Sequence, residues 1–346
     1  MSLLPSAPDQ PGVPVSPAGG APFVSIVVPT LNEERYIEDC LRSLAGAAAG
    51  VEFEILVMDG GSDDRTGEIV RAVAQAIPGI ALHHNPQRLQ SAAVNLAARL
   101  ASPRAAVILR ADAHAHYPPG FVRRCVDALA GHGAASVVVP MLTRGHGGMQ
   151  RAIAAAQNSR LGNGGAAHRV GGRSGFVEHG HHAAFDRATF LRLGGYDARF
   201  THNEDAEFDL RLRRAGGRIW MCGDAPVTYF PRETLRRLAR QYVRHGRGRA
   251  RTLVLHRLRP KPRQLAPVCV LLLCAASLPL ALASAWFLLV PGAYAAMCLA
   301  WAVRQSALAG DPWLLAAGPA VMTMHLAWAW GFLEQLAAAK TGSKQG

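Results

Sequence analysis

The sequence predicts an α/β domain built on a mostly parallel sheet, followed by helices that cross a membrane. Between Phe23 and Leu109, short runs of β-branched and apolar residues alternate with segments of helical pattern. Such alternation is typical of parallel strands joined by right-handed helical crossovers. Further along, the forty residues from Gln264 to Val303 include no charged side chain. An uncharged stretch of that length indicates membrane-spanning helices.

The first half of the chain supplies the clearest elements. Buried strands are predicted over Phe23–Val28, Phe53–Met58, Ile80–His83 and Ala105–Leu109. The helices between them are predicted over Asn32–Leu44, with Asn32 as its cap, and over 66–76 and Leu89–Leu100. Weaker patterns indicate strands over Val137–Val139 and Arg218–Met221, and helices over Met149–Arg160, Phe185–Leu193 and Asp205–Ala215. Because ligands bind beyond the carboxyl ends of parallel strands, the polar residues there are the candidate site.

Positive charge is concentrated in one segment. The chain of 346 residues has a net charge of +13, and Arg232–Arg263 alone holds twelve Lys or Arg residues against the single acid Glu233. Such a run can bind nucleic acid, but this one borders an apolar stretch and lacks the interleaved aromatic residues of such sites. We therefore expect no nucleic-acid partner. Residues 231–263 are interpreted as a basic amphipathic segment on anionic lipid at the cytoplasmic membrane face.

Composition sets the remaining boundaries. Residues 1–22, rich in Pro, Gly and Ala, are predicted to be a disordered tail, 23–230 the α/β domain, and 337–346 a second tail. Residues 264–336 would form two or three membrane helices, with two passes broken near Pro291-Gly292 and a third candidate over Pro312–Leu333. A soluble helical domain is the alternative. The six cysteines show no paired spacing, which indicates neither a disulfide framework nor a zinc site.

Acidic side chains follow two of the predicted strands. Asp59 ends a strand, where its carboxylate could bind a base or ribose, or could cap the next helix. Asp112 and His114 are two residues apart, so in an extended segment their side chains point the same way. Together they could hold a divalent metal, with a surface turn as the alternative.

Two more groups of polar residues lie in the second half of the domain. His179, His181 and His182 form the densest histidine group; zinc binding is conceivable, but the lining of an acceptor cavity fits better because no spaced Cys/His pairs accompany them. Glu204 and Asp205 begin an amphipathic helix. An acid there could stabilise the helix terminus or could deprotonate an acceptor hydroxyl.

The order of the motifs is more specific than any one of them. They are Val-Ser-Ile-Val-Val-Pro-Thr-Leu-Asn-Glu-Glu (24–34), Asp-Gly-Gly-Ser-Asp-Asp-Arg-Thr (59–66), Asp-Ala-His (112–114) and Glu-Asp-Ala-Glu-Phe (204–208). Over roughly residues 23–250 this series resembles the family 2 glycosyltransferases. The resemblance implies their GT-A fold, which has a Rossmann-like nucleotide-binding domain. The sequence looks most like the branch that makes bacterial exopolysaccharide, of the succinoglycan glucosyltransferase type.

The resemblance also implies roles for the matching residues. Donor-binding residues would be Pro29, Thr30, Glu33, Asp59, Arg88, Asn95 and Asp112. Asp112 matches the first acid of the family's Asp-x-Asp motif and His114 replaces the second, so both would hold Mg²⁺ or Mn²⁺. Asp205 matches the catalytic base, with Glu204 as the next candidate. Gln241 and Arg244 partly resemble the Gln-x-x-Arg-Trp motif of processive synthases and would lie near the acceptor or diphosphate; the missing Trp indicates single-sugar addition.

The expected function is inverting transfer of a hexose, glucose being the expected sugar, from a UDP-sugar to a polyprenyl-diphosphate-linked saccharide in exopolysaccharide synthesis. The protein would be multi-pass in the bacterial inner membrane, with its catalytic domain in the cytosol. A polyprenyl-phosphate glycosyltransferase of the dolichol-phosphate-mannose type and a processive synthase are alternatives. A membrane scaffold with a degenerate transferase domain is another, although intact Asp59, Asp112 and Asp205 argue against it.

Overall fold

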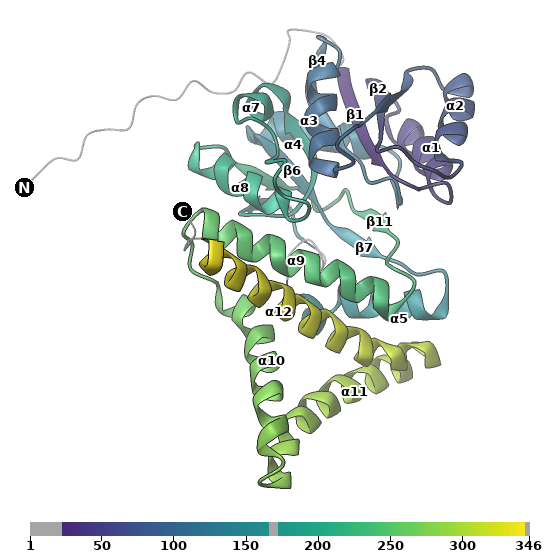
Figure 1. Cartoon of the computed structure of the whole chain (residues 1–346). Coiled ribbons are helices and arrows are strands. Elements are labelled where there is room, and N and C mark those ends of the chain that lie inside the picture. Colours follow the sequence, from purple (N-terminus) through teal and green to yellow (C-terminus); the bar gives the residue numbers. More distant parts are fainter. Residues whose placement is uncertain (1–22, 166–171, 343–346) are drawn as a thin grey trace, which may run out of the picture.

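A large mixed sheet organises the first two thirds of the chain (Figure 1). The computed structural model describes residues 23–165 and 172–342, so the tail predicted at 1–22 and the last residues of the tail predicted at 337–346 lie outside the described part. Eight strands form the sheet in the order β3-β2-β1-β4-β9-β6-β10-β8. Their bounds are β1 Phe23–Thr30, β2 Glu52–Asp59, β3 Ile80–His84, β4 Ala105–Arg110, β6 Ser136–Val139, β8 Gly175–Val177, β9 His181–Asp186 and β10 Ile219–Met221.

The half of the sheet nearest the N-terminus is parallel, as predicted. β1 pairs in parallel with β2 and β4, and β2 pairs in parallel with β3. β9 runs antiparallel between β4 and β6, and β8 is antiparallel to β10. A second sheet of three short strands has the order β5-β11-β7, with β5 at Ala115–His116, β7 at Met141–Thr143 and β11 at Val227–Tyr229.

Helices cover both faces of the large sheet. Along β1 the side chains alternate: Val24, Ile26 and Val28 pack with α1 (Ile37–Ala47), α2 (Thr66–Ala76) and α4 (Phe121–His132). Val27 faces the opposite side, where α3 (Gln90–Leu100), α7 (Arg187–Arg192) and α8 (Glu204–Arg214) complete a second core. Strands buried on both faces read as continuous apolar runs, which is why the sequence pattern identified them.

The first helix starts five residues later than predicted. Asn32 does not cap it; this residue adopts a left-handed conformation (φ 58°), and its side chain accepts a hydrogen bond from the Asp63 backbone (3.0 Å). α1 begins at Ile37, so Glu38 and Asp39, rather than Glu33 and Glu34, occupy its first turn. Residues 32–36, which were predicted to be helical, instead form a loop at the carboxyl edge of the sheet.

The predicted helix over Phe185–Leu193 is only partly correct. Phe185 and Asp186 belong to β9, and the helix α7 begins at Arg187 because the Asp186 side chain caps it through the Thr189 backbone (2.7 Å). The helical segment predicted near Met149–Arg160 is confirmed as α5 (Gly148–Asn158) followed by the short α6 (Arg160–Asn163).

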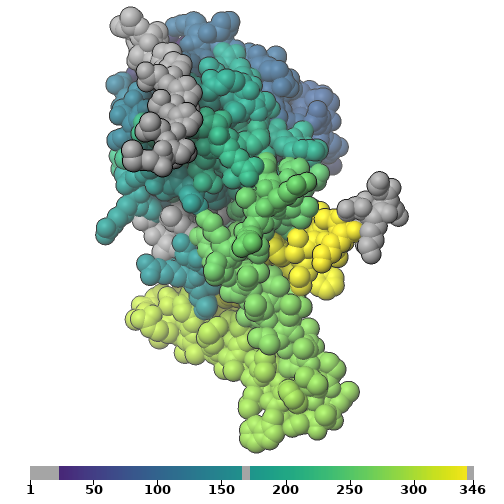
Figure 2. Space-filling view, turned by 90° about the vertical axis from the view of Figure 1, so that its left-hand side faces the viewer, coloured from purple at the N-terminus to yellow at the C-terminus, as the bar shows by residue number. Residues whose placement is uncertain are grey.

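The last third of the chain forms a triangle of helices beneath the sheet domain (Figure 1). The basic segment becomes α9 (Leu235–Leu255), and α12 (Ala317–Gly342) lies along it. Between them, α10 (Pro262–Leu280) descends and α11 (Leu289–Ala309) returns, joined through η2 (Ala285–Leu288); η3 (Pro312–Ala316) leads into α12. Figure 2 shows this α10–α11 hairpin projecting away from the rest of the molecule.

The membrane prediction needs two corrections. The break between the first two apolar helices falls at residues 281–288, not near Pro291-Gly292, which lie inside α11. Within the described residues two helical stretches, Pro262–Leu280 and Ala285–Ala309, are long and apolar enough to cross a membrane. The third span expected over Pro312–Leu333 is not among them, because α12, although 26 residues long, is less apolar than the other two helices; it packs on α9 and α5.

Candidate active site

The loops that follow β1 and β2 are locked together at the carboxyl edge of the sheet. Thr30 and Asp59 are register partners at the ends of their strands, as are Pro29 and Met58. Both carboxylate oxygens of Asp59 accept from the Ser62 backbone (3.2 Å), and one also accepts from its hydroxyl (2.6 Å). Asp59 thus holds the Gly60-Gly61 turn in shape, while the helix-capping role falls to Asp64 at Thr66 (2.9 Å).

This loop pair forms one wall of the expected donor site. Thr30 is buried and its hydroxyl oxygen has no hydrogen-bond partner among the described residues. Arg88 has a left-handed backbone (φ 55°), and its Cα would lie 3.4 Å from a Cβ added at Gly60. Pro29, Thr30 and Asp59 therefore lie together at the ends of β1 and β2, with Arg88 beside the Gly60 turn, and their donor-binding role stays a prediction.

Asn95 has a different place. Its amide donates to the Tyr196 carbonyl (2.7 Å) and accepts from the Tyr196 N–H (2.8 Å). Both ends of the side chain are therefore committed to fixing α3 against the turn before residue 196. The donor-binding role expected for Asn95 stays a prediction.

A buried arginine links the donor side of the site to the acidic pair on α8. Arg110, 7% exposed, ends β4; its Nη2 lies 3.3 Å from Asp112 Oδ1 and its Nη1 lies 4.0 Å from Glu204 Oε1. Gln90 also donates to Asp112 (3.0 Å), and His181 Nε2 lies 3.5 Å from the other oxygen. Burial alone would favour the neutral acid, but Arg110 and His181 outweigh it and hold the pKa of Asp112 below its usual value.

His114 faces a carboxylate that the sequence assigned to the donor. Its Nδ1 lies 3.0 Å from Glu33 Oε1, and its ring meets Tyr229 edge-on at 5.1 Å between centroids. Although burial lowers the pKa of His114, the nearby Tyr229, Glu33 and Asp112 raise it to about 10. The position therefore attracts positive charge.

A divalent ion bound at Asp112 and His114 would need further ligands from a substrate. Within the described residues no cluster of three or more His, Cys, Asp or Glu side chains is arranged to hold a metal. Asp112 and His114 offer one carboxylate and one imidazole, and Mg²⁺ commonly takes the rest of its ligands from phosphates and water. An imidazole ligand also suits Mn²⁺. The residues fit a metal that arrives with a diphosphate.

Helix α9 holds the start of α8 in place. Asn203 has a left-handed backbone (φ 69°), and its side chain donates to Thr252 Oγ1 on α9 (3.0 Å). Gly248 allows this approach, since a Cβ there would lie 2.3 Å from the His202 carbonyl oxygen. The basic segment thus positions the residues that precede Glu204 and Asp205.

The two adjacent carboxylates of α8 have different acidities. Burial raises the pKa of Glu204, which is 5% exposed, and the neighbouring charge of Asp205 raises it further. Burial acts in the same direction on Asp205, but the His179 and His182 rings and Arg110 lower its pKa below the usual range. Environments that separate two carboxylates in this way mark Asp205 as the ionised member, with its oxygens free of a proton and able to accept one.

The three histidines do not form a zinc site. His179 Nδ1 and His182 Nε2 contact the two oxygens of Asp209 at 2.7 and 2.8 Å, and His182 Nδ1 lies 2.6 Å from the Tyr196 hydroxyl. His181 instead contacts Asp112. His179 and His181 line the large cavity, whereas His182 is buried and does not.

A cavity of about 1650 Å³ unites the site. Asp112, His114, Glu204 and Asp205 line one part of it, and Gln241 and Arg244 on α9 line another. The Gln241 side-chain oxygen is buried without a hydrogen-bond partner among the described residues, so it is available to a ligand. The structure therefore brings Asp112, His114, Glu204, Asp205, Gln241 and Arg244 to one open cavity.

Comparison with known proteins identifies the family. Residues 25–194 match the family described as glycosyl transferase family 2. The chain is also 42% identical over 312 residues to the succinoglycan biosynthesis protein ExoA of Rhizobium meliloti, covering 90% of this chain and 94% of that protein. The chain belongs to glycosyltransferase family 2.

Other relatives of this family 2 enzyme act on lipid phosphates, according to their names. An undecaprenyl-phosphate 4-deoxy-4-formamido-L-arabinose transferase of Pseudomonas fluorescens is 35% identical over 108 residues, or 30% of this chain and 31% of that protein. A mannosyltransferase structure from Pyrobaculum calidifontis, solved with GDP-mannose and Mn²⁺, has a TM-score of 0.56 at 21% identity and covers 92% of this chain and 88% of that chain. That structure shares the fold, which confirms the GT-A expectation.

Sequence reasoning missed the residue that joins the two halves of this glycosyltransferase site. Arg110 carries charge at the end of an otherwise apolar strand, Ala105–Arg110, and is followed by Asp112. A charged residue ending a buried strand is uncommon unless it is paired, so the signal was present. The partner Glu204 lies 94 positions away, which no local pattern reveals.

Proposed function

We propose that this glycosyltransferase moves a hexose, with glucose expected, from a UDP-sugar to a saccharide carried on polyprenyl diphosphate. The observation that supports this best is the set of residues that line the large cavity. The cavity extends from Asp205 to apolar side chains of the three C-terminal helices, including Val270 on α10, Met297 on α11 and Trp328 on α12. An amphiphilic acceptor needs such a combination of acidic and apolar linings in one cavity.

The middle of the cavity suits a diphosphate. Arg240, Arg244 and Arg249 line it on α9, next to Gln241. Guanidinium groups bind phosphate oxygens through paired hydrogen bonds, so this stretch supports an anionic link between sugar and lipid. The same cations could also stabilise a leaving UDP.

The mechanism would be a single displacement with inversion. Asp205, ionised in its present surroundings, would take the proton of the acceptor hydroxyl as its oxygen bonds to the anomeric carbon and UDP leaves with the bonding electrons. Arg110 would keep Asp112 and Glu204 correctly oriented. Mg²⁺ or Mn²⁺ at Asp112 and His114, when bound, would neutralise charge on the diphosphate.

The relatives' names support a role in exopolysaccharide synthesis. The ExoA similarity extends over nearly the whole chain, including the membrane-associated helices. Its name links it to succinoglycan, and we transfer that role to this protein as part of the proposal. The undecaprenyl-phosphate transferases favour a second candidate, in which the acceptor is a polyprenyl phosphate without a sugar.

The proposed location is the bacterial inner membrane, with the catalytic domain in the cytosol. Two exposed apolar helices, α10 and α11, support membrane insertion, and the basic α9 supports contact with anionic lipid. UDP-sugars are cytosolic, so the donor side must face that compartment.

The test is UDP release by the full-length protein in lipid nanodiscs. We expect release from UDP-glucose only when a polyprenyl-diphosphate-linked sugar is supplied, and loss of release in Asp205→Asn. Release with polyprenyl phosphate alone would favour the second candidate. Absence of release with UDP-glucose, UDP-galactose and other nucleotide sugars, each with both lipids, would indicate the scaffold alternative.

A further inference from the structure

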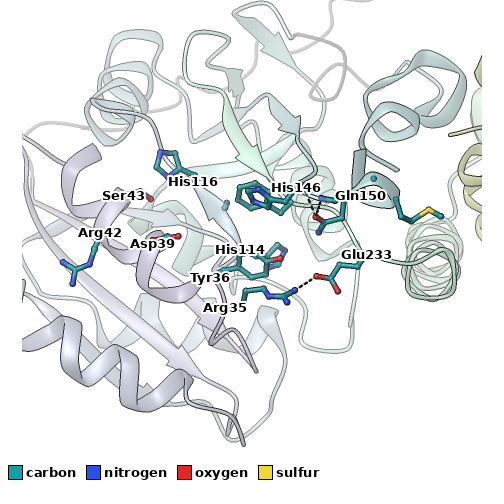
Figure 3. Close-up of a pocket in the computed structure, with 15 residues that line it drawn as sticks. Arg35, Tyr36, Asp39, Arg42, Ser43, His114, His116, His146, Gln150 and Glu233 are labelled. Carbon is teal, nitrogen blue, oxygen red and sulfur yellow. Dashed lines mark hydrogen bonds and ion pairs between the residues drawn. The ribbon is translucent and has the colours of Figure 1, made fainter. Parts of the chain in front are cut away.

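A second cavity lies beside the active site and has a different character. It measures about 1010 Å³ and lies between the start of α1 and the residues that precede α5 and α9 (Figure 3). It shares a single lining residue, His114, with the large cavity, and Asp205 is not part of it. A molecule bound there would not be the reacting acceptor group.

One wall of this second cavity is aromatic. The Phe230 ring stacks with Tyr36 (centroids 5.8 Å apart, 12° between planes) and with His146 (4.5 Å, 26°). The three rings come from separate segments, and none of the three residues is fully buried. An apolar wall of this kind packs against the C–H-rich face of a pyranose ring while the hydroxyl groups stay free to bond elsewhere.

The rim of the second cavity carries both hydrogen-bond donors and acceptors. Arg35 forms an ion pair with Glu233, while Arg42 and Asp39 extend from α1. Arg42 pairs with Glu38 (2.9 Å), and the lining holds two guanidinium groups, two carboxylates and the imidazoles of His114, His116 and His146, in contrast to the many arginines of the large cavity. A mixed set of donors and acceptors suits neutral hydroxyl groups, which both donate and accept, better than it suits a phosphate.

The walls are held in place before any ligand binds. Gln150, 5% exposed, accepts from the backbone N–H of His146 (3.1 Å) and Gly147 (3.4 Å) and donates to the Pro231 carbonyl (3.0 Å). This side chain ties the loop that carries His146 to the segment that carries Phe230 and Glu233. Because the site is already ordered, a ligand loses less free energy to conformational ordering.

We propose that this second cavity is a saccharide-binding subsite for a neutral hexose unit that is not the reacting one. Two sources of that sugar share the same chemistry: outer residues of the lipid-linked acceptor, and a free oligosaccharide. In either case the sugar would lie one side chain, His114, away from the proposed donor diphosphate. The binding part of the inference does not depend on turnover, so it can fail or succeed independently of the proposed function.

The first experiment measures binding with soluble probes. Full-length protein in a detergent without a sugar headgroup is titrated with cellotriose and with laminaritriose by saturation-transfer NMR and calorimetry. We expect at least one of them to bind and its Kd to rise about tenfold or more in Tyr36→Ala and in Asp39→Asn. Asp39 is exposed, and its side chain makes no hydrogen bond or ion pair with any other described residue, so we expect that variant to keep the fold. Phe176→Ala, which removes an exposed aromatic ring elsewhere, is the matched control and should bind normally.

The second experiment separates the two sources of the sugar. If outer acceptor residues occupy the subsite, Asp39→Asn raises the KM for the lipid-linked saccharide and leaves kcat nearly unchanged. If a free oligosaccharide occupies it, the KM for the acceptor stays the same and added trisaccharide changes the rate of the wild type alone. Absence of binding by both trisaccharides, or equal binding by wild type and both cavity variants, would overturn the proposal.

Discussion

At the scale of single residues, the adjacent acids of α8 give the sharpest prediction. Asp205→Asn should lower the rate of transfer about 10²- to 10⁴-fold, because the amide cannot accept the acceptor proton. UDP affinity should stay within a few fold, since Asp205 lines the acceptor side of the cavity. Steady-state transfer and UDP titration measure both quantities. Glu204→Gln is the comparison, because Glu204 is already biased toward its neutral form. Wild-type turnover in Asp205→Asn would transfer the base assignment to Glu204.

His114 gives a prediction about metal affinity. His114→Ala should raise the Mn²⁺ concentration needed for half-maximal activity more than it weakens metal-free UDP binding. Glu33→Gln keeps the ring but removes its carboxylate partner, and loss of such a partner typically weakens metal affinity about 10- to 100-fold. Titration of activity with Mn²⁺ measures both effects. Unchanged Mn²⁺ curves in His114→Ala would show that His114 is not a ligand, and His181 would be tested next.

Asp209 gives a prediction about pH and stability. Burial opposes ionisation of this residue, 1% exposed, but His182 and His179 outweigh it, so its pKa lies below the usual value. Because the pKa of Asp209 is lower in the folded than in the unfolded protein, its ionised form stabilises the fold at any pH above the unfolded-state pKa. This stabilisation is lost as the pH falls from the unfolded-state pKa to the folded-state pKa. Asp209→Asn should therefore cost on the order of 3 kcal/mol at neutral pH. The difference in Tm between variant and wild type should shrink below about pH 4. A constant difference across pH would contradict this account.

The sequence identified most strand-end residues of the site, but not their partners. Asp59, Asp112 and Asp205 follow or precede elements that the hydrophobic pattern locates, so their convergence was predictable. The pairing of Arg110 with Glu204, and of Asp209 with two histidines, depends on tertiary packing. The contact of Asn95 with Tyr196, 101 positions away, depends on tertiary packing as well.

At the scale of elements, α9 and α12 pack closely against each other at glycine residues. A Cβ added at Gly246 would lie 2.1 Å from the Trp328 carbonyl oxygen, and one added at Gly331 would lie 2.1 Å from that of Val243. Gly246→Ala should therefore push the helices apart and destabilise the protein by about 1–3 kcal/mol or more. Thermal unfolding in detergent measures this change.

Gly292→Ala is the matched control for the helix crossing. Gly292 lies inside α11 with no atom within 4 Å of an added Cβ. Alanine there should be neutral or should stabilise by up to about 1 kcal/mol, because it favours the helix. Equal melting temperatures for Gly246→Ala and Gly292→Ala would mean that the helices do not meet at this glycine.

Short elements were the hardest to predict. β5, β7, β8 and β11 have only two or three residues each, too few for an alternating pattern to be recognised. β9 was read as the start of a helix because Phe185–Leu193 is apolar at helical spacing as well. Asn32 resembled a helix cap, but it contacts the Ser62–Asp63 turn, a tertiary contact that overrides the local preference.

At the scale of the whole molecule, the α10–α11 hairpin begins and ends on the catalytic domain. Lys261, just before α10, forms an ion pair with Glu178. Asp311, just after α11, pairs with Arg151 on α5 (2.7 Å). The segment that was the candidate for a third span lies mostly in α12, which pairs with α9 through Glu334 and Arg247 (2.7 Å). Both ends of the hairpin and the start of α9 therefore lie on one side of any membrane that the hairpin enters.

This arrangement predicts the topology. Reporter fusions after Arg263, after Gly310 and at the C-terminus should all give cytosolic signals. α10 has 19 residues, about 28 Å as a helix, close to the roughly 30 Å hydrocarbon core, so a tag inserted after Ala283 should be reached from outside. An external signal at the C-terminus would mean that α12 leaves α9 and crosses the membrane. An external signal after Arg263 would overturn the orientation as a whole, because the twelve basic residues of the segment before it would then lie on the wrong side of the positive-inside rule.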